Sequence, residues 1–370
     1  MNTKKSKVYV TSFRTTQTEN LLQKLRRLAI TAGMKTIDFT DKYAAIKIHF
    51  GEPGNLAFLR PNYAKVVADL ITELGGKPFL TDCNTLYVGG RKNALDHMDA
   101  AYLNGFSPFS TGCHVIIGDG LKGTDETYVD LSDGEYVKQA KIGRAVMDAD
   151  IFISLTHFKA HEGAGFGGAI KNIGMGCGSR AGKMEMHSSG KPSVTQEACV
   201  GCGMCRKNCA HGAITIEAKK AFINHDTCVG CGRCIGACPK DAVHPGADHS
   251  GDILNCKMAE YAAAVLRGRP HFHISLVMDV SPFCDCHAEN DAPIVPDVGM
   301  FASFDPVALD QACADAVNAQ PVLEGSYLDE KQHTHDDHFC DIHPSTNWKT
   351  QISHAEKMHL GTREYELVHI

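Results

Sequence analysis

The stretch CVGCGMCRKNCAHGAITIEAKKAFINHDTCVGCGRCIGAC, from Cys199 to Cys238, decides the organisation of this chain. It contains two copies of one spacing, C-x2-C-x2-C-x3-C, which is typical of bacterial ferredoxins that bind two 4Fe–4S clusters. Three closely spaced thiolates wrap one face of a cluster, and the fourth ligand comes from the other run. The sequence therefore predicts a first cluster on Cys199, Cys202, Cys205 and Cys238, and a second on Cys228, Cys231, Cys234 and Cys209.

Two other uses of these cysteines are zinc knuckles and a disulfide framework. Zinc sites rarely repeat a three-plus-one spacing, and no secretion signal is evident at the start of the chain. The residues between the runs predict a short hairpin over 213–224. The first run differs from the second in one respect, because Ala210 stands where the second run has Pro239.

Length and charge place this chain among globular proteins that bind no nucleic acid. It has 370 residues, 43% of them hydrophobic, and a net charge of −6, so no basic surface is indicated. We find no apolar run of membrane-spanning length. Sixteen cysteines without a secretion signal favour reduced thiols that bind metal. We therefore expect a cytoplasmic protein without membrane contact.

Outside the cysteine runs, strand and helix signals alternate, which predicts an α/β fold with a mostly parallel sheet covered by helices. Strands are expected at 7–12, 43–50, 78–82, 114–119, 150–158, 271–280 and 298–303, and a hairpin at 128–141. Helices are expected at 20–32, 61–74, 93–104, 251–268 and 306–316. We expect an α/β domain in two parts, 1–195 and 247–370, with a small α+β ferredoxin module inserted at 196–246.

The segment 157–180, HFKAHEGAGFGGAIKNIGMGCGSR, follows the most apolar strand of the first half. Open α/β sheets bind ligands at the carboxyl ends of their strands. We predict a catalytic role for His157, Lys159, His161 and Lys171, with the histidines as proton donors or metal ligands. A candidate anion- or substrate-binding loop comprises Gly163, Gly165, Gly167, Gly168 and Arg180, because glycines expose backbone N–H groups.

Other interpretations of this segment stay open. Three of its glycines fit a dinucleotide fingerprint, but more glycine follows rather than a clean helix, so the fit is weak. The loop could also pack against the ferredoxin module without a ligand. Cys177 is either a further ligand or a packed thiol.

Further metal candidates follow other strands. Cys284 and Cys286, in the run Cys284-Asp-Cys286-His287, can reach one ion, as a third metal site or a redox-active thiol pair. The histidine-rich run 333–343 either binds metal or forms a solvated loop, and the second is favoured. Polar residues also end two earlier strands and suggest one shared cleft: His49, Glu52, Asn55, Asp82 and Asn84. Four other cysteines are expected to pack as apolar residues: Cys83, Cys113, Cys256 and Cys313.

Several of these segments together resemble the domain-of-unknown-function family number three hundred and sixty-two, a family of uncharacterised iron–sulfur centre proteins. The resemblance rests on IKIHFGEPGN (46–55), LTDCNTLYVG (80–89), HFKAHE (157–162) through Gly176-Cys177, Cys284-Asp-Cys286, APIVPDVG (292–299), DPVALD (305–310) and GTREYEL (361–367). It implies an α/β domain that carries an inserted two-cluster ferredoxin, and it supplies no settled reaction.

Three functions compete at this point. The first is an oxidoreductase whose clusters feed electrons to a small substrate or an extra metal at the strand ends. The second is an electron carrier, and the third a redox sensor or assembly factor. The size of the chain favours an enzyme, because a carrier needs only a minimal two-cluster domain. A redox partner protein is expected in each case, and a homodimer is a further expectation.

Overall fold

An eight-stranded sheet forms the centre of the protein, in the order β16-β1-β15-β14-β7-β2-β3-β4. The computed structural model describes residues 5–87, 89–187, 191–246, 251–331 and 336–370. The strands are β1 (Ser6–Thr11), β2 (Tyr43–Lys47), β3 (Lys77–Asp82), β4 (His114–Ile117), β7 (Ile151–His157), β14 (His271–Val277), β15 (Gly299–Ser303) and β16 (Tyr365–His369). Of these, β15 alone runs antiparallel to its neighbours. The predicted α/β fold with a mostly parallel sheet is confirmed.

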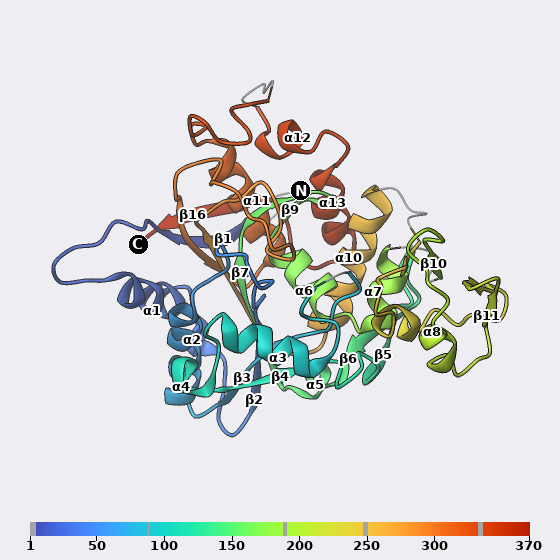
Figure 1. The fold of residues 1–370 in the computed structure, drawn as a ribbon. Helices are drawn as coiled ribbons and strands as arrows, with labels where there is room; N and C mark the ends of the chain where they lie inside the picture. Colours follow the sequence, from blue (N-terminus) through green and yellow to red (C-terminus); the bar gives the residue numbers. More distant parts are fainter. Residues whose placement is uncertain (1–4, 88, 188–190, 247–250, 332–335) are drawn as a thin grey trace.

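Helices cover both faces of this sheet (Figure 1). One face carries α1 (Leu21–Thr31), α2 (Pro61–Glu73), α3 (Ala94–Leu103) and α4 (Pro108–Thr111), and the other α6 (Ala169–Cys177), α10 (Gly251–Leu266), α11 (Pro306–Asn318) and α13 (Trp348–Lys357). The central strand β7 is buried on both sides. Its Ile153 and Leu155 pack into the first layer and its Phe152 into the second, as expected for alternating side chains in a parallel sheet.

The remaining elements are short. They are η1 (Met34–Thr36), α5 (Arg144–Asp148), α7 (Arg180–His187), α8 (Met204–Lys207), α9 (Arg233–Gly236), α12 (His338–Ile342), β5 (Glu126–Asp130), β6 (Gln139–Gly143), β8 (Lys159–His161), β9 (Gly165–Gly167), β10 (Pro192–Val194), β11 (Ile214–Glu217), β12 (Lys220–Ile223) and β13 (Val243–Pro245). The expected hairpin near 128–141 is formed by β5 and β6, and the one between the cysteine runs by β11 and β12.

Residues 192–245, here called the cysteine module, stand at one side of the sheet domain beside α7 and α10 (Figure 1). Strand β10 pairs antiparallel with β13, so the module begins and ends in one small ladder. A second ladder joins β11 to β12, and α8 and α9 follow the glycines inside the two cysteine runs. The ladder starts at Pro192, earlier than the expected module boundary at 196. The three-part division itself stays a prediction.

The glycine-rich segment differs from its expected form, because its second half is the helix α6. Glycine is costly inside a helix unless a close approach requires it. Gly174 supplies that reason, since a Cβ there would overlap the carbonyl of Met258 on α10. Gly176 supplies another, since a Cβ there would overlap the buried side chain of Lys47. The glycines allow α6 to lie close to both neighbours.

Candidate functional site

A cavity of about 250 Å³ lies at the carboxyl ends of β2, β3 and β7. Parallel strands bring their carboxyl ends to one edge of the sheet, where ligand sites are common. The titratable side chains that line it are Lys47, His49, Asp82, Cys83, Tyr87, Arg91, Lys159, His161, Lys171, Lys183, His187, Cys284, Cys286 and His287. Of the strand-end residues expected in one shared cleft, His49 and Asp82 line this cavity, in which cations outnumber carboxylates.

One face of α6 forms a wall of this cavity. Its lining residues recur at helical spacing: Gly168, Lys171, Asn172, Met175 and Gly176. The opposite face packs in the core, where Cys177 is fully buried among apolar side chains. This placement decides between the two interpretations of Cys177 in favour of a packed thiol.

Three of the predicted site residues meet in the cavity. The ligand atoms of His161, Cys284 and Cys286 all lie within 4.8 Å of one another. Lys171 Nζ lies 3.8 Å from Cys284 Sγ. Two thiolates and one imidazole are donors that zinc or iron accepts, and three protein ligands leave a fourth position open for water or substrate. This group is a candidate metal site.

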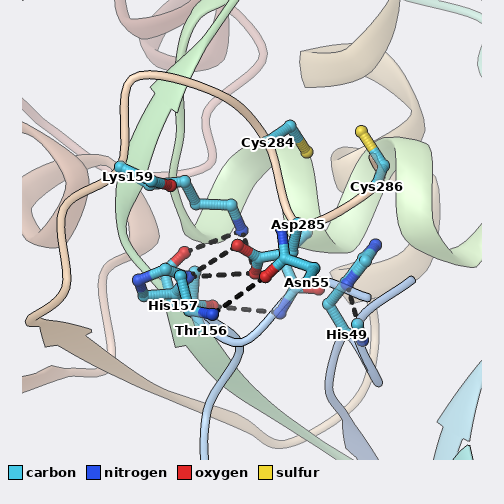
Figure 2. Close-up of polar contacts among 12 residues, drawn as sticks. His49, Asn55, Thr156, His157, Lys159, Cys284, Asp285 and Cys286 are labelled. Carbon is cyan, nitrogen blue, oxygen red and sulfur yellow. Dashed lines mark hydrogen bonds and ion pairs between the residues drawn. The ribbon is translucent and has the colours of Figure 1, made fainter. Parts of the chain in front are cut away.

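Asp285, between the two cysteines, determines the direction in which they point. Its buried carboxylate lies 2.9 Å from Lys159 Nζ and 2.9 Å from His157 Nδ1. Figure 2 shows this carboxylate turned toward His157 and Lys159, while the sulfur of Cys286 points away from it. Burial by itself would raise the pKa of Asp285, but the two cations hold it well below its ordinary value.

His157 therefore supports the site and does not line it. Its Nδ1 faces Asp285, and its Nε2 lies 2.8 Å from the carbonyl oxygen of Met278. Both ring nitrogens face acceptors, so both are satisfied only when each carries a hydrogen. Lys159 combines the two roles, because it binds Asp285 and also lines the cavity.

His161 is held by its own loop. Its Nδ1 accepts bonds from the backbone N–H groups of Gly163 and Ala164, at 3.0 and 3.1 Å. In the neutral ring the hydrogen is then on Nε2, where it can be donated to a thiolate. A metal ion would require Nε2 to give up this hydrogen, or would have to displace the two amides from Nδ1.

The two thiols titrate together. Burial acts to raise the pKa of Cys284, but the hydrogen bond to Cys286 and the charge of Lys171 bring it below its ordinary value. The same hydrogen bond and burial raise the pKa of Cys286. The hydrogen bond between the two sulfurs thus acts in opposite directions on them and favours the thiolate at Cys284 over the one at Cys286.

Arg91 was not predicted from sequence as a site residue, and it lines the cavity. It is fully buried, pairs with Glu52 at 2.8 Å, contacts His49 Nε2 at 2.8 Å, and bonds Tyr87 at 3.0 Å. Burial lowers the pKa of His49, and the charge of Arg91 lowers it further. A lone arginine in a loop gave no pattern from which this role could be inferred.

The other strand-end residues divide between lining the cavity and supporting it. Asp82 lines the cavity and pairs with Lys47 at 3.1 Å. Asn55 donates to the carbonyl of His287 at 3.0 Å and so ties the loop after β2 to the Cys284–Cys286 loop. Asn84 donates to Asp119 and lies outside the lining.

The candidate anion loop is only partly at the cavity. Gly167 and Gly168 line it, whereas Gly165 packs against Trp348, and Gly163 and Arg180 are not among the lining residues. Asp310 accepts bonds from Ala169 N–H (2.6 Å) and Ile170 N–H (2.9 Å) at the start of α6. A carboxylate therefore occupies the place where a dinucleotide pyrophosphate would bind, which removes the dinucleotide interpretation.

The remaining histidine candidates make structural contacts where they are described. His333 and His335 lie outside the described residues. His338, on α12, is buried and bonds the carbonyl of Gln320, and His343 bonds the carbonyl of Pro282. The solvated loop favoured from sequence is thus wrong for His338. Cys83, Cys113, Cys256 and Cys313 are all buried, as expected.

The cysteine module contains two small cavities, each lined by four cysteines. Cys199, Cys202, Cys205 and Cys238 line one of them. Cys209, Cys228, Cys231 and Cys234 line the other. Backbone N–H groups point at two of the sulfurs, from Ala221 to Cys199 at 3.3 Å and from Gly230 to Cys228 at 3.4 Å. These sets are the two that the spacing assigns to the two predicted clusters.

A family model described as "Domain of unknown function (DUF362)" matches residues 44–315. The chain therefore belongs to the DUF362 family, and the resemblance noted from its motifs is confirmed to that extent.

Similar proteins cover the chain less completely. It is 27% identical over 125 residues to a thylakoid-associated protein of Synechocystis sp., which is 34% of this chain and 35% of that protein. The lactate racemase apoprotein of Thermoanaerobacterium thermosaccharolyticum aligns with a TM-score of 0.34 and 11% identity, over 74% of this chain and 51% of that chain. A protein from Thermotoga maritima aligns with a TM-score of 0.41 and 13% identity, over 80% and 57%. The chain thus spans about a third to about half the length of these proteins.

No helix among the described residues combines the length and apolar character needed to cross a membrane.

Proposed function

We propose that this chain is an iron–sulfur oxidoreductase. Its cysteine module holds two 4Fe–4S clusters, and electrons pass from them to the group formed by His161, Cys284 and Cys286. The observation that carries this proposal is the position of α7, which separates the module from the cavity. Met184 of α7 packs in one hydrophobic cluster with Cys199, Cys205 and Cys234, while Lys183 and His187 of the same helix line the cavity.

The cysteine sulfurs of the module are suitable ligands for two 4Fe–4S clusters. Each of its two cavities is lined by four thiols. The other titratable side chains that line them, among the residues that the structure describes, are Lys240 at the first and His211 and Arg233 at the second. Amide N–H groups that donate to thiolate sulfur favour the ligated, negatively charged state. When bound, the clusters would supply low-potential one-electron carriers.

A second contact joins the module to the cavity. Leu86 lines the cavity and also belongs to the hydrophobic cluster that contains Cys199, Cys205 and Cys234. Packed side chains therefore connect the module to the cavity. A carrier that used the α/β domain only for docking would not need a charged cavity directly behind its clusters.

The charges of the cavity favour a small anion as the substrate. Lys47 is paired with Asp82, Lys159 with Asp285, and Arg91 with Glu52. Neither Lys171 nor Lys183 has a carboxylate within ion-pair distance among the residues that the structure describes; Lys183 donates to the carbonyl of Gly178 at 2.6 Å. Two cations facing one cavity without carboxylate partners favour a carboxylate- or phosphate-bearing substrate.

The thiol–imidazole group can serve in two ways. As a metal site, it offers three ligands and an open position. As a dithiol, it relies on the backbone hydrogen bonds to His161 Nδ1, which keep a hydrogen on Nε2 that can be donated to a thiolate. Reduction of a Cys284–Cys286 disulfide to this dithiol takes up two electrons and two protons. The hydrogen bonds of His161 favour the dithiol, and the close approach of the three ligand atoms favours the metal.

Elemental analysis tests the proposal and separates these two forms. Anaerobically purified protein should contain about eight iron and about eight sulfide per chain, from two clusters of four. Cys284→Ser/Cys286→Ser should keep this content and lose any additional iron or zinc if the group binds metal. No additional metal in either protein would indicate the dithiol. Wild-type protein without sulfide would overturn the proposal.

A further inference from the structure

Arg180, the first residue of α7, is buried and forms no ion pair with any of the described residues. It is 3% exposed. Its guanidinium donates to the carbonyl of Lys92, and its Nε has no hydrogen-bond partner. No described carboxylate lies within ion-pair distance of it. An uncompensated buried charge is strongly destabilising, so a nearby anion is expected.

The side chain of Arg180 lies against the second cysteine run. A Cβ at Gly232 would be 2.9 Å from Arg180 Cγ, and a Cβ at Gly236 would overlap the guanidinium itself. These two glycines flank Cys234, which is a predicted ligand of the second cluster. At these two positions the absence of a side chain allows Arg180 to lie against the backbone of the second cysteine run.

The electrostatic surroundings of the guanidinium agree with this placement. Burial lowers the pKa of Arg180, while the charges of Asp119, Cys234 and Cys231 act to raise it. Asp119 lies beyond ion-pair distance of the guanidinium, and the other two groups are cysteines of the second cavity, whose sulfurs would carry negative charge as cluster ligands. The side chain thus sits where the negative charge of a bound cluster would compensate it.

We propose that Arg180 is the counter-ion of the second cluster, held by Cys209, Cys228, Cys231 and Cys234, and that it makes this cluster easier to reduce than the first. The inference rests on the proposed function, because it requires the clusters. Reduction adds a negative charge to the cluster, and a fixed buried cation in a medium of low dielectric constant stabilises that charge.

This difference in reduction potential between the two clusters favours electron transfer from the first cluster to the second. At the first cavity Cys202 is exposed, so a redox partner can approach there. The second run lies against Arg180 and Met184, on the helix whose Lys183 and His187 line the cavity. An electron that enters at the first cluster therefore moves inward, to the cluster beside α7 and then to the cavity.

Redox titration of the anaerobically purified full chain, followed by electron paramagnetic resonance, tests this role. In Arg180→Gln we expect one of the two clusters to become at least tenfold harder to reduce, about 59 mV for a one-electron couple. The other cluster should keep its potential. Arg180→Lys, which retains the charge, should restore most of the shift.

Arg206→Gln is the control, because Arg206 is an exposed arginine of the same module that lines neither of its two cavities. Its clusters should titrate as in the wild type, since solvent screens the charge. Unchanged potentials in Arg180→Gln with full iron content would overturn the counter-ion role, as would an equal shift of both clusters. If Arg180→Gln loses iron and Arg180→Lys keeps it, the counter-ion role is supported. If both variants lose iron, Arg180 serves packing alone. Wild-type protein without clusters would instead overturn the proposed function.

Discussion

The carboxylate of Asp285 holds the two neighbouring thiols in place through buried charge. His157 and Lys159 come from the end of β7 and from β8, so a single anion joins two strand ends and the Cys284–Cys286 loop. Such a triad is sensitive to the loss of one member, because the remaining charges stay buried without compensation.

Asp285→Asn keeps the shape of the side chain and removes its charge. We expect the free energy of unfolding to fall by about 3–5 kcal/mol, as found when one partner of a buried ion pair is removed. Urea denaturation followed by circular dichroism measures this change. Asp133→Asn is the control, since Asp133 pairs with Arg267 on the surface, where the loss should be barely measurable. Equal losses in the two variants would show that the triad does not hold the loop.

At the scale of elements, the start of α6 positions the cavity wall. Asp310 caps the helix, and Gly168 must be glycine because a Cβ would overlap that carboxylate. Burial raises the pKa of Asp310 to about 7, although its two backbone bonds act in the opposite direction. The glycines of this segment thus serve helix packing and capping more than backbone contact with a ligand.

Gly168→Ala should displace Asp310 and uncap α6, with a loss of about 1–2 kcal/mol of stability. Gly163→Ala is the matched control within the same segment, because its nearest neighbours lie 3.6 Å from the added Cβ and its backbone is not in the left-handed region. Thermal unfolding of both variants measures the difference. A Gly163→Ala protein as unstable as Gly168→Ala would argue against the capping explanation.

The helices α10 and α13 are joined by an ion pair that depends on pH. His354 Nε2 lies 2.9 Å from Glu260, whose carboxylate also binds the backbone of residues 135–137. Burial acts to lower the pKa of His354, but the hydrogen bonds to Cys256 and Glu260 raise it to about 9. Since the folded pKa lies above the ordinary value near 6.5, the stabilisation is complete below about pH 6.5 and is lost as pH rises through about 9.

His354→Gln should therefore be less stable than the wild type at pH 6, by an amount that shrinks toward pH 9.5. Denaturation midpoints of both proteins across this range measure the difference. A stability gap that stays constant with pH would mean that the pair does not titrate in this window.

At the scale of the whole molecule, the sheet and its main helices could be predicted because their apolar residues follow regular periods. The edge strand β16 was missed, since Tyr365–His369 is half exposed and carries little apolar signal. His161, Cys284 and Cys286 could be named from their residue types, but their meeting depends on the carboxyl ends of distant strands. Arg91 and the pairing of Asp285 with His157 required the folded chain, because no local pattern records contacts over such sequence separations.

The central claim is that the clusters deliver electrons to the Cys284–Cys286–His161 group. An anaerobic reductive titration that counts electrons per chain, in the wild type and in Cys284→Ser/Cys286→Ser, tests it most directly. Both proteins should have equal iron and sulfide content. The double variant should take up about two electrons, one for each cluster, and the wild type more, because its cavity group is also reduced. Equal electron counts in the two proteins would contradict this claim and would favour a function as an electron carrier.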